Sequence, residues 1–245
     1  MCQDCGCGDV DLVPLDVQQR ILARNDDVAA HNRAHFRERG IFAVNLMGSP
    51  GSGKTAILEA TAGALNDGSK LAAVAGDLAT DNDSARLVKA GIRSRAITTG
   101  QACHLDAEMV HHALHHFDLS DVKYFFIENV GNLVCPAVYD LGQTVNVVAL
   151  SVTEGEDKPL KYPTMFANAD LVLLTKIDLS LHLPRLRIGA LYDALAQVMP
   201  NPHVISVGAF EGLGVHRWIE WLADRREAMI GSELGAEVPA YEVMV

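Results

Sequence analysis

One eight-residue segment constrains this chain more than any other: Gly48-Ser49-Pro50-Gly51-Ser52-Gly53-Lys54-Thr55. It fits the phosphate-binding pattern G-x-x-x-x-G-K-[ST] at every fixed position. The apolar run Ile41–Met47 before it predicts a strand, and Ala56–Leu65 after it predicts a helix. In such a loop the backbone N–H groups and the helix N-terminus bind phosphate, Lys54 reaches the β- and γ-phosphates, and Thr55 ligates Mg²⁺. The sequence therefore predicts a nucleotide-binding protein.

Short apolar segments alternate with helical patterns after this point, which predicts an α/β fold with a doubly wound, mostly parallel sheet. A continuous apolar run such as Val145–Val152 indicates a strand buried on both faces. In this architecture the ligand lies beyond the carboxyl ends of the strands. The further strands expected are Leu71–Ala75, Arg95–Ile97, Tyr124–Glu128, Val145–Val152, Leu171–Thr175 and His203–Val207. The further helices expected are Asp16–Arg39, Ser84–Ala90, Ala107–Phe117, Pro159–Phe166, Pro184–Val198 and Val215–Met229.

The charge balance of the chain limits its partners. Its 245 residues include 20 basic and 31 acidic side chains, a net charge of −11, which argues against nucleic acid or an anionic membrane surface as the main partner. No apolar run reaches transmembrane length, and the N-terminus lacks the layout of a signal peptide. A cytoplasmic location is expected, where the five cysteines are reduced thiols suited to metal binding or redox work.

Two acidic strand ends are candidates for holding Mg²⁺. Glu128 ends an apolar strand and Gly131 follows three residues later, the layout of a GTPase switch in which the carboxylate holds Mg²⁺ and the Gly N–H senses the γ-phosphate. Asp77 ends another strand. It is either a second carboxylate on the Mg²⁺ side or an ordinary turn residue.

The segment Thr175-Lys176-Ile177-Asp178 resembles the guanine-specifying Asn-Lys-x-Asp of GTPases. Asp178 would accept both N–H groups on the guanine edge, and the stem of Lys176 would pack on the base. Thr175 replaces the usual Asn, so the guanine contacts depend on the other two side chains. A salt-bridged surface turn is the alternative.

Two groups of cysteines predict metal sites. Cys2, Cys5 and Cys7 place three thiols within six residues, which can chelate one soft or borderline ion. The alternatives are redox pairing of Cys2 with Cys5 and a disordered tail whose cysteines have no function. The second group is Cys103, His104 and Cys135, a set that suits Zn²⁺ or Ni²⁺. Because Cys135 follows the predicted switch, nucleotide hydrolysis would act directly on metal affinity.

Four histidines form two i,i+4 pairs within the predicted helix Ala107–Phe117: His111 with His115, and His112 with His116. A solvated helix face is the favoured interpretation, and weak auxiliary metal storage is the alternative.

Taken together, several of these segments resemble the HypB family, the nickel-incorporation GTPases of [NiFe]-hydrogenase maturation. The resemblance covers nearly all of residues 41 to 222. It is carried by the phosphate loop, Gly100–Ala107, Glu128–Pro136 and Ser151–Pro163, and the Cys-x-x-Cys-Gly-Cys start is similar to a nickel motif that some members carry.

The resemblance implies a slow GTPase of the SIMIBI class (signal-recognition, MinD and BioD) that works as a GTP-dependent homodimer. It implies GTP/GDP, Mg²⁺ and Ni²⁺ or Zn²⁺ as ligands. It also implies a HypA-type nickel chaperone and the hydrogenase large-subunit precursor as partners. The expected division is a flexible Cys-rich tail over residues 1–15, a helix over 16–40, the P-loop GTPase domain over 41–230 and a tail over 231–245.

Three other functions stay open at this point. A small-molecule P-loop kinase offers no reason for Cys103, His104 and Cys135, and a passive metal-binding protein predicts nickel affinity indifferent to the nucleotide. A urease-type nickel GTPase shares the mechanism, but the N-terminal cysteine motif and the Asn-Leu-Val-Cys stretch argue against it.

Overall fold

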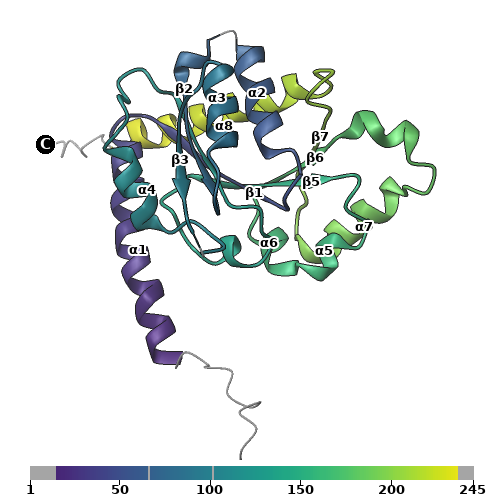
Figure 1. Cartoon of the computed structure of the whole chain (residues 1–245), viewed down its shortest axis with the longest axis horizontal. Coiled ribbons are helices and arrows are strands. Elements are labelled where there is room, and N and C mark those ends of the chain that lie inside the picture. The colour runs from purple at the N-terminus through teal and green to yellow at the C-terminus, as the bar shows by residue number, and fades with distance from the viewer. Residues whose placement is uncertain (1–14, 66, 101, 237–245) are drawn as a thin grey trace, which may run out of the picture.

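The computed structural model describes residues 15–65, 67–100 and 102–236, and a parallel sheet of seven strands runs through the middle of this part of the chain (Figure 1). The strand order is β3-β2-β4-β1-β5-β6-β7, and every neighbouring pair is parallel. Since β1 is the central strand, the loop that follows it emerges in the middle of the carboxyl edge, where ligands bind in such sheets. The predicted fold class is confirmed.

The strands begin and end within two residues of their predicted limits. They are β1 (Phe42–Gly48), β2 (Leu71–Asp77), β3 (Arg93–Thr98), β4 (Tyr124–Glu128), β5 (Val145–Ser151), β6 (Leu171–Thr175) and β7 (Val204–Val207). Most of their residues are buried on both faces, as their continuous apolar runs predicted, whereas the edge strand β3 is only half-buried.

The helices cover the sheet and depart from prediction in places. They are α1 (Leu15–Arg37), α2 (Lys54–Leu65), α3 (Asn82–Lys89), α4 (Ala107–Leu114), α5 (Lys158–Lys161), α6 (Pro163–Ala167), α7 (Ile188–Val198) and α8 (Val215–Ala236), with short 3₁₀ turns η1 (Gly68–Lys70), η2 (Cys135–Ala137) and η3 (Ile177–His182). The single helix predicted over 159–166 is wrong. It is divided into α5 and α6 because Pro163 has no N–H with which to continue the helical bonds.

Three helix limits also differ from prediction by more than two residues. Helix α4 ends at Leu114, because the amides of His116 and Phe117 bond three residues back, as in a 3₁₀ turn. Helix α7 begins four residues later than expected. Helix α8 continues to Ala236, six residues past the predicted end of the domain at 230.

Alternation along β1 divides the core between the two faces of the sheet. Phe42, Val44 and Leu46 belong to the cluster formed with α2, α3 and α8. Ala43 packs on the opposite face with α1 and α4, and Met47 packs with α6 and α7 on that same side (Figure 1). Both faces of the central strand are therefore covered, and only its carboxyl end is available to a ligand.

Helix α1 lies along α4, and much of it extends beyond the sheet (Figure 1). Its fully buried Asn32 donates from the side-chain amide to the carbonyls of Ala107 (2.9 Å) and Leu141 (3.2 Å). The Asn25 amide donates to the carbonyl of Asp140 at 2.8 Å. These bonds fasten α1 to the start of α4 and to the segment that follows η2. No helix in the described ranges combines the length and apolarity needed to cross a membrane.

Candidate nucleotide and metal sites

The predicted phosphate loop joins β1 to α2 at the carboxyl edge of the sheet. Gly53 has a φ of +98°, in the left-handed region that glycine adopts without strain. The switch glycine lies against this loop, because a Cβ on Gly131 would stand 2.8 Å from the backbone nitrogen of Pro50. The backbone N–H of Asn132 also donates to the carbonyl of Gly48 at 3.1 Å. Loop and switch segment therefore touch directly.

A cavity of about 490 Å³ opens over the loop, within the size range of small-molecule sites. It brings together most of the predicted nucleotide residues. Its lining includes Pro50, Gly51, Gly53, Lys54, Thr55, Asp77, Glu128, Gly131 and Lys176. Asp83, Arg86 and Phe210 line it as well, and none of these three was singled out from the sequence.

The floor of the cavity is a buried cluster of oxygens. The Thr55 hydroxyl lies 2.7 Å from Glu128 Oε1 and 2.9 Å from Asp83 Oδ1. Glu128 is 3% exposed, and its Oε2 has no hydrogen-bond partner among the described residues. Burial raises the pKa of Glu128 to about 7, although the Thr55 hydrogen bond and Lys54 oppose the shift. A hydroxyl and two carboxylates that converge in this way are the oxygen ligands that Mg²⁺ prefers.

Lys54 is buried beneath the loop, where its ammonium lies 3.4 Å from the carbonyl of Gly48 and 3.3 Å from that of Ser49. Burial lowers the pKa of Lys54, against the attraction of Glu128 and Asp83. A buried ammonium whose close partners among the described residues are two carbonyls is well placed to bind an anion, because phosphate oxygens would supply the opposite charge.

The carboxylate of Asp77 lines the cavity but is occupied by its own turn. It accepts from the backbone N–H of Ala79 at 3.0 Å and from the N–H and hydroxyl of Thr80. These bonds, that of Ala79 first, lower its pKa. The turn interpretation thus describes Asp77 as it lies here, whereas Asp83 contacts Thr55 directly.

The segment predicted to recognise the base contacts the phosphate loop through Thr175, the residue in the place of the usual Asn. The Thr175 hydroxyl is buried and donates to the carbonyl of Ser52 at 2.5 Å, so it ties this segment to the phosphate loop. Lys176 follows in a left-handed conformation, with a φ of +58°. The Oδ1 atom of Asp178 is buried and has no partner among the described residues. An unpaired buried carboxylate oxygen is an acceptor in need of a donor.

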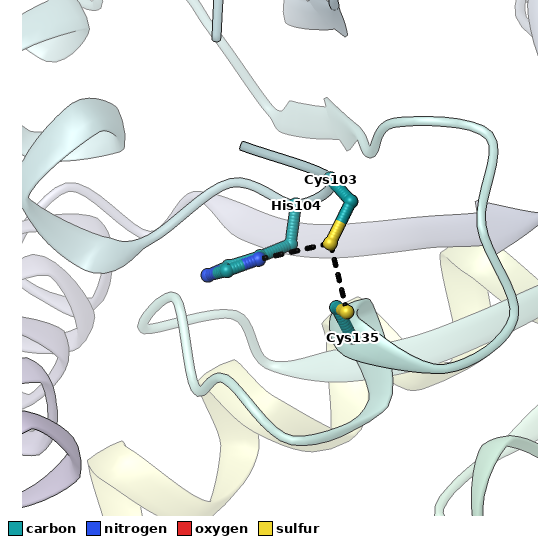
Figure 2. Close-up of side chains that lie close together, drawn as sticks. All are labelled: Cys103, His104 and Cys135. Atoms are coloured by element: carbon teal, nitrogen blue, oxygen red, sulfur yellow. Dashed lines mark hydrogen bonds between the residues drawn. The ribbon is translucent and has the colours of Figure 1, made fainter. Parts of the chain in front are cut away.

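The second predicted cluster also comes together. Cys103 and His104 lie in the loop before α4, and Cys135 begins η2; one ligand atom from each falls within 4.8 Å of the others (Figure 2). The two sulfurs are 2.8 Å apart, and Cys103 Sγ lies 3.8 Å from His104 Nδ1. A tetrahedral ion with metal–sulfur bonds of about 2.3 Å separates two thiolates by roughly 3.8 Å, so a displacement of about 1 Å would admit one.

The electrostatics of this cluster suit a transition metal. Burial lowers the pKa of His104, against the pull of Asp106, which keeps the imidazole neutral and able to coordinate. The Tyr139 ring stacks on His104 with 3.9 Å between centroids and fixes the plane of the imidazole. The pKa of the Cys135 thiol is raised by the hydrogen bond between Cys135 and Cys103 and by burial. Metal binding would therefore release protons from the thiols.

Asn132 connects the two sites. Its backbone N–H bonds to the carbonyl of Gly48 in the phosphate loop, and its side-chain amide donates to the carbonyl of Cys103 at 3.1 Å. Its Oδ1 accepts from the N–H of Val134, next to Cys135. Sequence analysis missed this role, because a single Asn between Gly131 and Leu133 carries no signal of its partners.

Two sets of predicted residues are not joined to these sites. Cys2, Cys5 and Cys7 lie outside the described residues. Lys176, two residues before Asp178, lines the cavity, whereas Asp178 itself is not part of the cavity lining.

Comparison with known proteins places the chain in a family of nucleotide-binding proteins. Residues 42–191 match the family model described as CobW/HypB/UreG, nucleotide-binding domain. The chain is 47% identical to the hydrogenase maturation factor HypB of Azotobacter vinelandii over 226 residues, which cover 92% of this chain and 73% of the relative.

Solved structures give the same result. The crystal structure of HypB from Helicobacter pylori in complex with nickel matches with a TM-score of 0.79 at 37% identity and covers 84% of this chain and 96% of that one. The crystal structure of the hydrogenase maturation factor HypB from Archaeoglobus fulgidus matches with a TM-score of 0.76 at 38% identity and covers 84% and 100%.

Proposed function

Because the chain belongs to the HypB family of hydrogenase maturation factors, we propose that it is a GTP-hydrolysing nickel metallochaperone. Nickel is its cargo, held by Cys103, His104 and Cys135, and the bound guanine nucleotide sets how tightly it is held. The proposal has two parts: a nucleotide site that fits GTP with Mg²⁺, and a contact through which that site acts on the metal ligands.

The cavity floor supports the nucleotide part. The unpartnered Glu128 Oε2 beside the Thr55 hydroxyl suits an ion held by oxygens, with Asp83 and Asp77 as further carboxylates. When bound, Mg²⁺ would neutralise charge on the phosphates. Lys54 would bind the β- and γ-phosphates, and the N–H of Gly131 would bond to the γ-phosphate. Hydrolysis is slow on this view, because the output is a conformational state.

The base-recognition segment supports guanine over adenine. Asp178 Oδ1 lies buried without a partner in the described part of the chain, and the two N–H groups on the guanine edge would satisfy such an acceptor. Adenine offers no such pair of donors. Lys176 borders the cavity, and its stem would pack on the base.

One observation carries the coupling part: Asn132 bonds to the phosphate loop through its backbone and to Cys103 through its side chain. A γ-phosphate that draws Gly131 towards the loop would shift Asn132 as well, and Cys103 and Cys135 with it. The distance between the two sulfurs would then depend on the nucleotide.

The partners and layout remain part of the proposal. A HypA-type nickel chaperone would be one partner, and the hydrogenase large-subunit precursor would receive the nickel. The working form would be a GTP-dependent homodimer in the cytoplasm. Cys2, Cys5 and Cys7 would form a separate metal-binding tail ahead of α1. The GTPase domain would extend from β1 to the end of α8 at Ala236, rather than to 230.

A nickel titration of the full chain tests the coupling. Cys2, Cys5 and Cys7 are replaced by Ser, so that only the inner site reports, and Ni²⁺ affinity is measured with GDP and with a non-hydrolysable GTP analogue. The Ni²⁺ affinities in these two nucleotide states are expected to differ by about tenfold, within the usual range of coupling between two sites. Asn132→Ala should bring the ratio towards one while GTP still binds.

Asn168 offers a matched control. Its exposed side-chain amide donates to the carbonyl of Ala137 at 3.2 Å, so it holds the same η2 turn without a link to Cys103. Asn168→Ala should keep the ratio of the parent. Equal nickel affinities in the two nucleotide states of the parent would contradict the coupling.

A further inference from the structure

A second group of imidazoles lies where α1 packs on α4. His31 and His35 are one turn apart on α1, and His111 and His115 are one turn apart at the end of α4. The His31 and His111 rings meet edge to face with 5.1 Å between centroids, and the His111 and His115 rings do so at 4.8 Å. His111 is therefore the centre of the group and is half-buried, so the solvated helix face expected from the sequence does not describe it.

The hydrogen bonds of Asn32 determine which ring nitrogen of a neutral His111 carries the proton. The Asn32 amide nitrogen donates to the carbonyls of Ala107 and Leu141, which leaves Oδ1 as an acceptor. His111 Nδ1 lies 3.1 Å from that oxygen and must donate its proton to it. A neutral His111 then presents a lone pair at Nε2. Histidine ligands of metals are oriented in this way, by an N–H bond from the other ring nitrogen.

The Nε2 atom of His111 faces a second imidazole. It lies 3.2 Å from His115 Nε2, and the two nitrogens share a hydrogen bond that a metal ion would replace. Metal–nitrogen bonds of about 2.0–2.1 Å place two ligand nitrogens roughly 3.0 to 3.4 Å apart in octahedral or tetrahedral sites. The pair thus already has the spacing of two ligands on one ion. Burial, followed by the neighbouring histidines, lowers the pKa of His111, which favours the neutral ligand form.

The surroundings add to this arrangement. His115 is the C-cap of α4, and the C-terminus of a helix favours a cation. The Nε2 atom of His35 is buried and has no partner among the described residues. Cys103 and His104 precede the N-terminus of α4, whereas His111 lies in its last turn, about 6 Å along the helix axis from Ala107, so the two groups are distinct.

We propose that His31, His111 and His115 form a second site for a divalent transition metal ion such as Ni²⁺, Co²⁺ or Zn²⁺, at the contact between α1 and α4, with His35 beside them. This site uses imidazole ligands alone, unlike the thiolate cluster, and it does not rest on the proposed function. Imidazole suits these ions. His31 is exposed, and its ring would have to turn to bring a nitrogen to the pair, because the three histidines do not lie with their ligand atoms within 4.8 Å of one another.

The test uses the full chain with all five cysteines replaced by Ser, so that no thiolate can bind the ion. Co²⁺ and Ni²⁺ are titrated separately, by visible absorption and by calorimetry. One ion per chain is expected, without the sulfur-to-metal charge-transfer band of thiolate sites. His111→Gln with His115→Gln should weaken binding about 10–100-fold.

The same segment provides a matched control. His112 and His116 have the same i,i+4 spacing but are both exposed, so His112→Gln with His116→Gln should leave the affinity within about twofold. His115→Gln alone, at an exposed position, removes a ligand without disturbing the core. Absence of binding to the cysteine-free chain, an unchanged affinity in His115→Gln, or equal losses in the two double variants would each overturn the proposal.

Discussion

Glu128 makes a prediction that depends on both the fold and the site. The carboxyl is buried under the phosphate loop, and its pKa in the nucleotide-free chain is about 7, against an ordinary value of 4.5. A carboxyl whose folded pKa is raised keeps its proton in the folded state after the unfolded state has lost it. Folding then takes up a proton, so the free energy of unfolding falls as the pH rises from about 4.5 to 7.

The magnitude follows from the shift. About 2.5 pKa units, at roughly 1.4 kcal/mol each, amount to about 3 kcal/mol once both pKa values are passed. Between pH 5 and pH 8 the free energy of unfolding falls by about 2–3 kcal/mol, since part of the total fall has already occurred at pH 5. Glu128→Gln mimics the protonated carboxyl and can still bond to Thr55, so it removes this pH dependence.

The assay is urea unfolding of the full chain at pH 5 and pH 8, without nucleotide and with a chelator. The stability of Glu128→Gln relative to the parent should rise by about 2–3 kcal/mol between these values, or roughly 5–10 °C in melting temperature. Mg²⁺ with nucleotide should stabilise the parent much more than the variant, because the variant lacks the carboxylate.

Asp77→Asn serves as a control, because the pKa of Asp77 is shifted in the opposite direction to that of Glu128. Hydrogen bonds, first from the N–H of Ala79, lower the pKa of Asp77 below its ordinary value of 3.8. Its stabilisation is therefore present above that value and lost only in stronger acid, so this variant should show no change in relative stability between pH 5 and pH 8. A relative stability of Glu128→Gln that also stays flat to within 1 kcal/mol would refute the reasoning.

Two further predictions concern the base and the core. Asp178→Asn should weaken GTP binding at least about a hundredfold, because a buried charged acceptor for two N–H groups is lost, while the weak binding of ATP stays the same; unchanged GTP affinity in a competition assay would mean that the base lies elsewhere. Trp218→Phe should lower the free energy of unfolding by about 1–3 kcal/mol in urea, because the indole N–H donates to the buried Thr61 hydroxyl at 2.9 Å, and a loss below 0.5 kcal/mol would contradict that role.

Much of the fold was predictable because its signals are local. Continuous apolar runs such as Leu171–Thr175 are typical of parallel sheets with both faces covered, and the pattern of Gly48–Thr55 specifies a strand, a loop and a helix in order. Helix limits were less predictable. Periodicity continues through Pro163, where the backbone cannot, and past Leu114, where the turn tightens.

Within the candidate sites, the sequence alone determined which residue types are available: a phosphate loop, an acidic strand end, and thiols with an imidazole. Only the tertiary structure decided which of them meet. Asp83 on α3 reaches Thr55 on α2 because β2 and β1, which precede these helices, end at the same edge of the sheet on either side of β4, and no spacing in the chain records that approach. The same holds for Asn132 with Cys103 and for His31 with His111. Contacts between distant segments depend on how helices and strands pack, whereas a motif within one loop is determined by the covalent order of its residues.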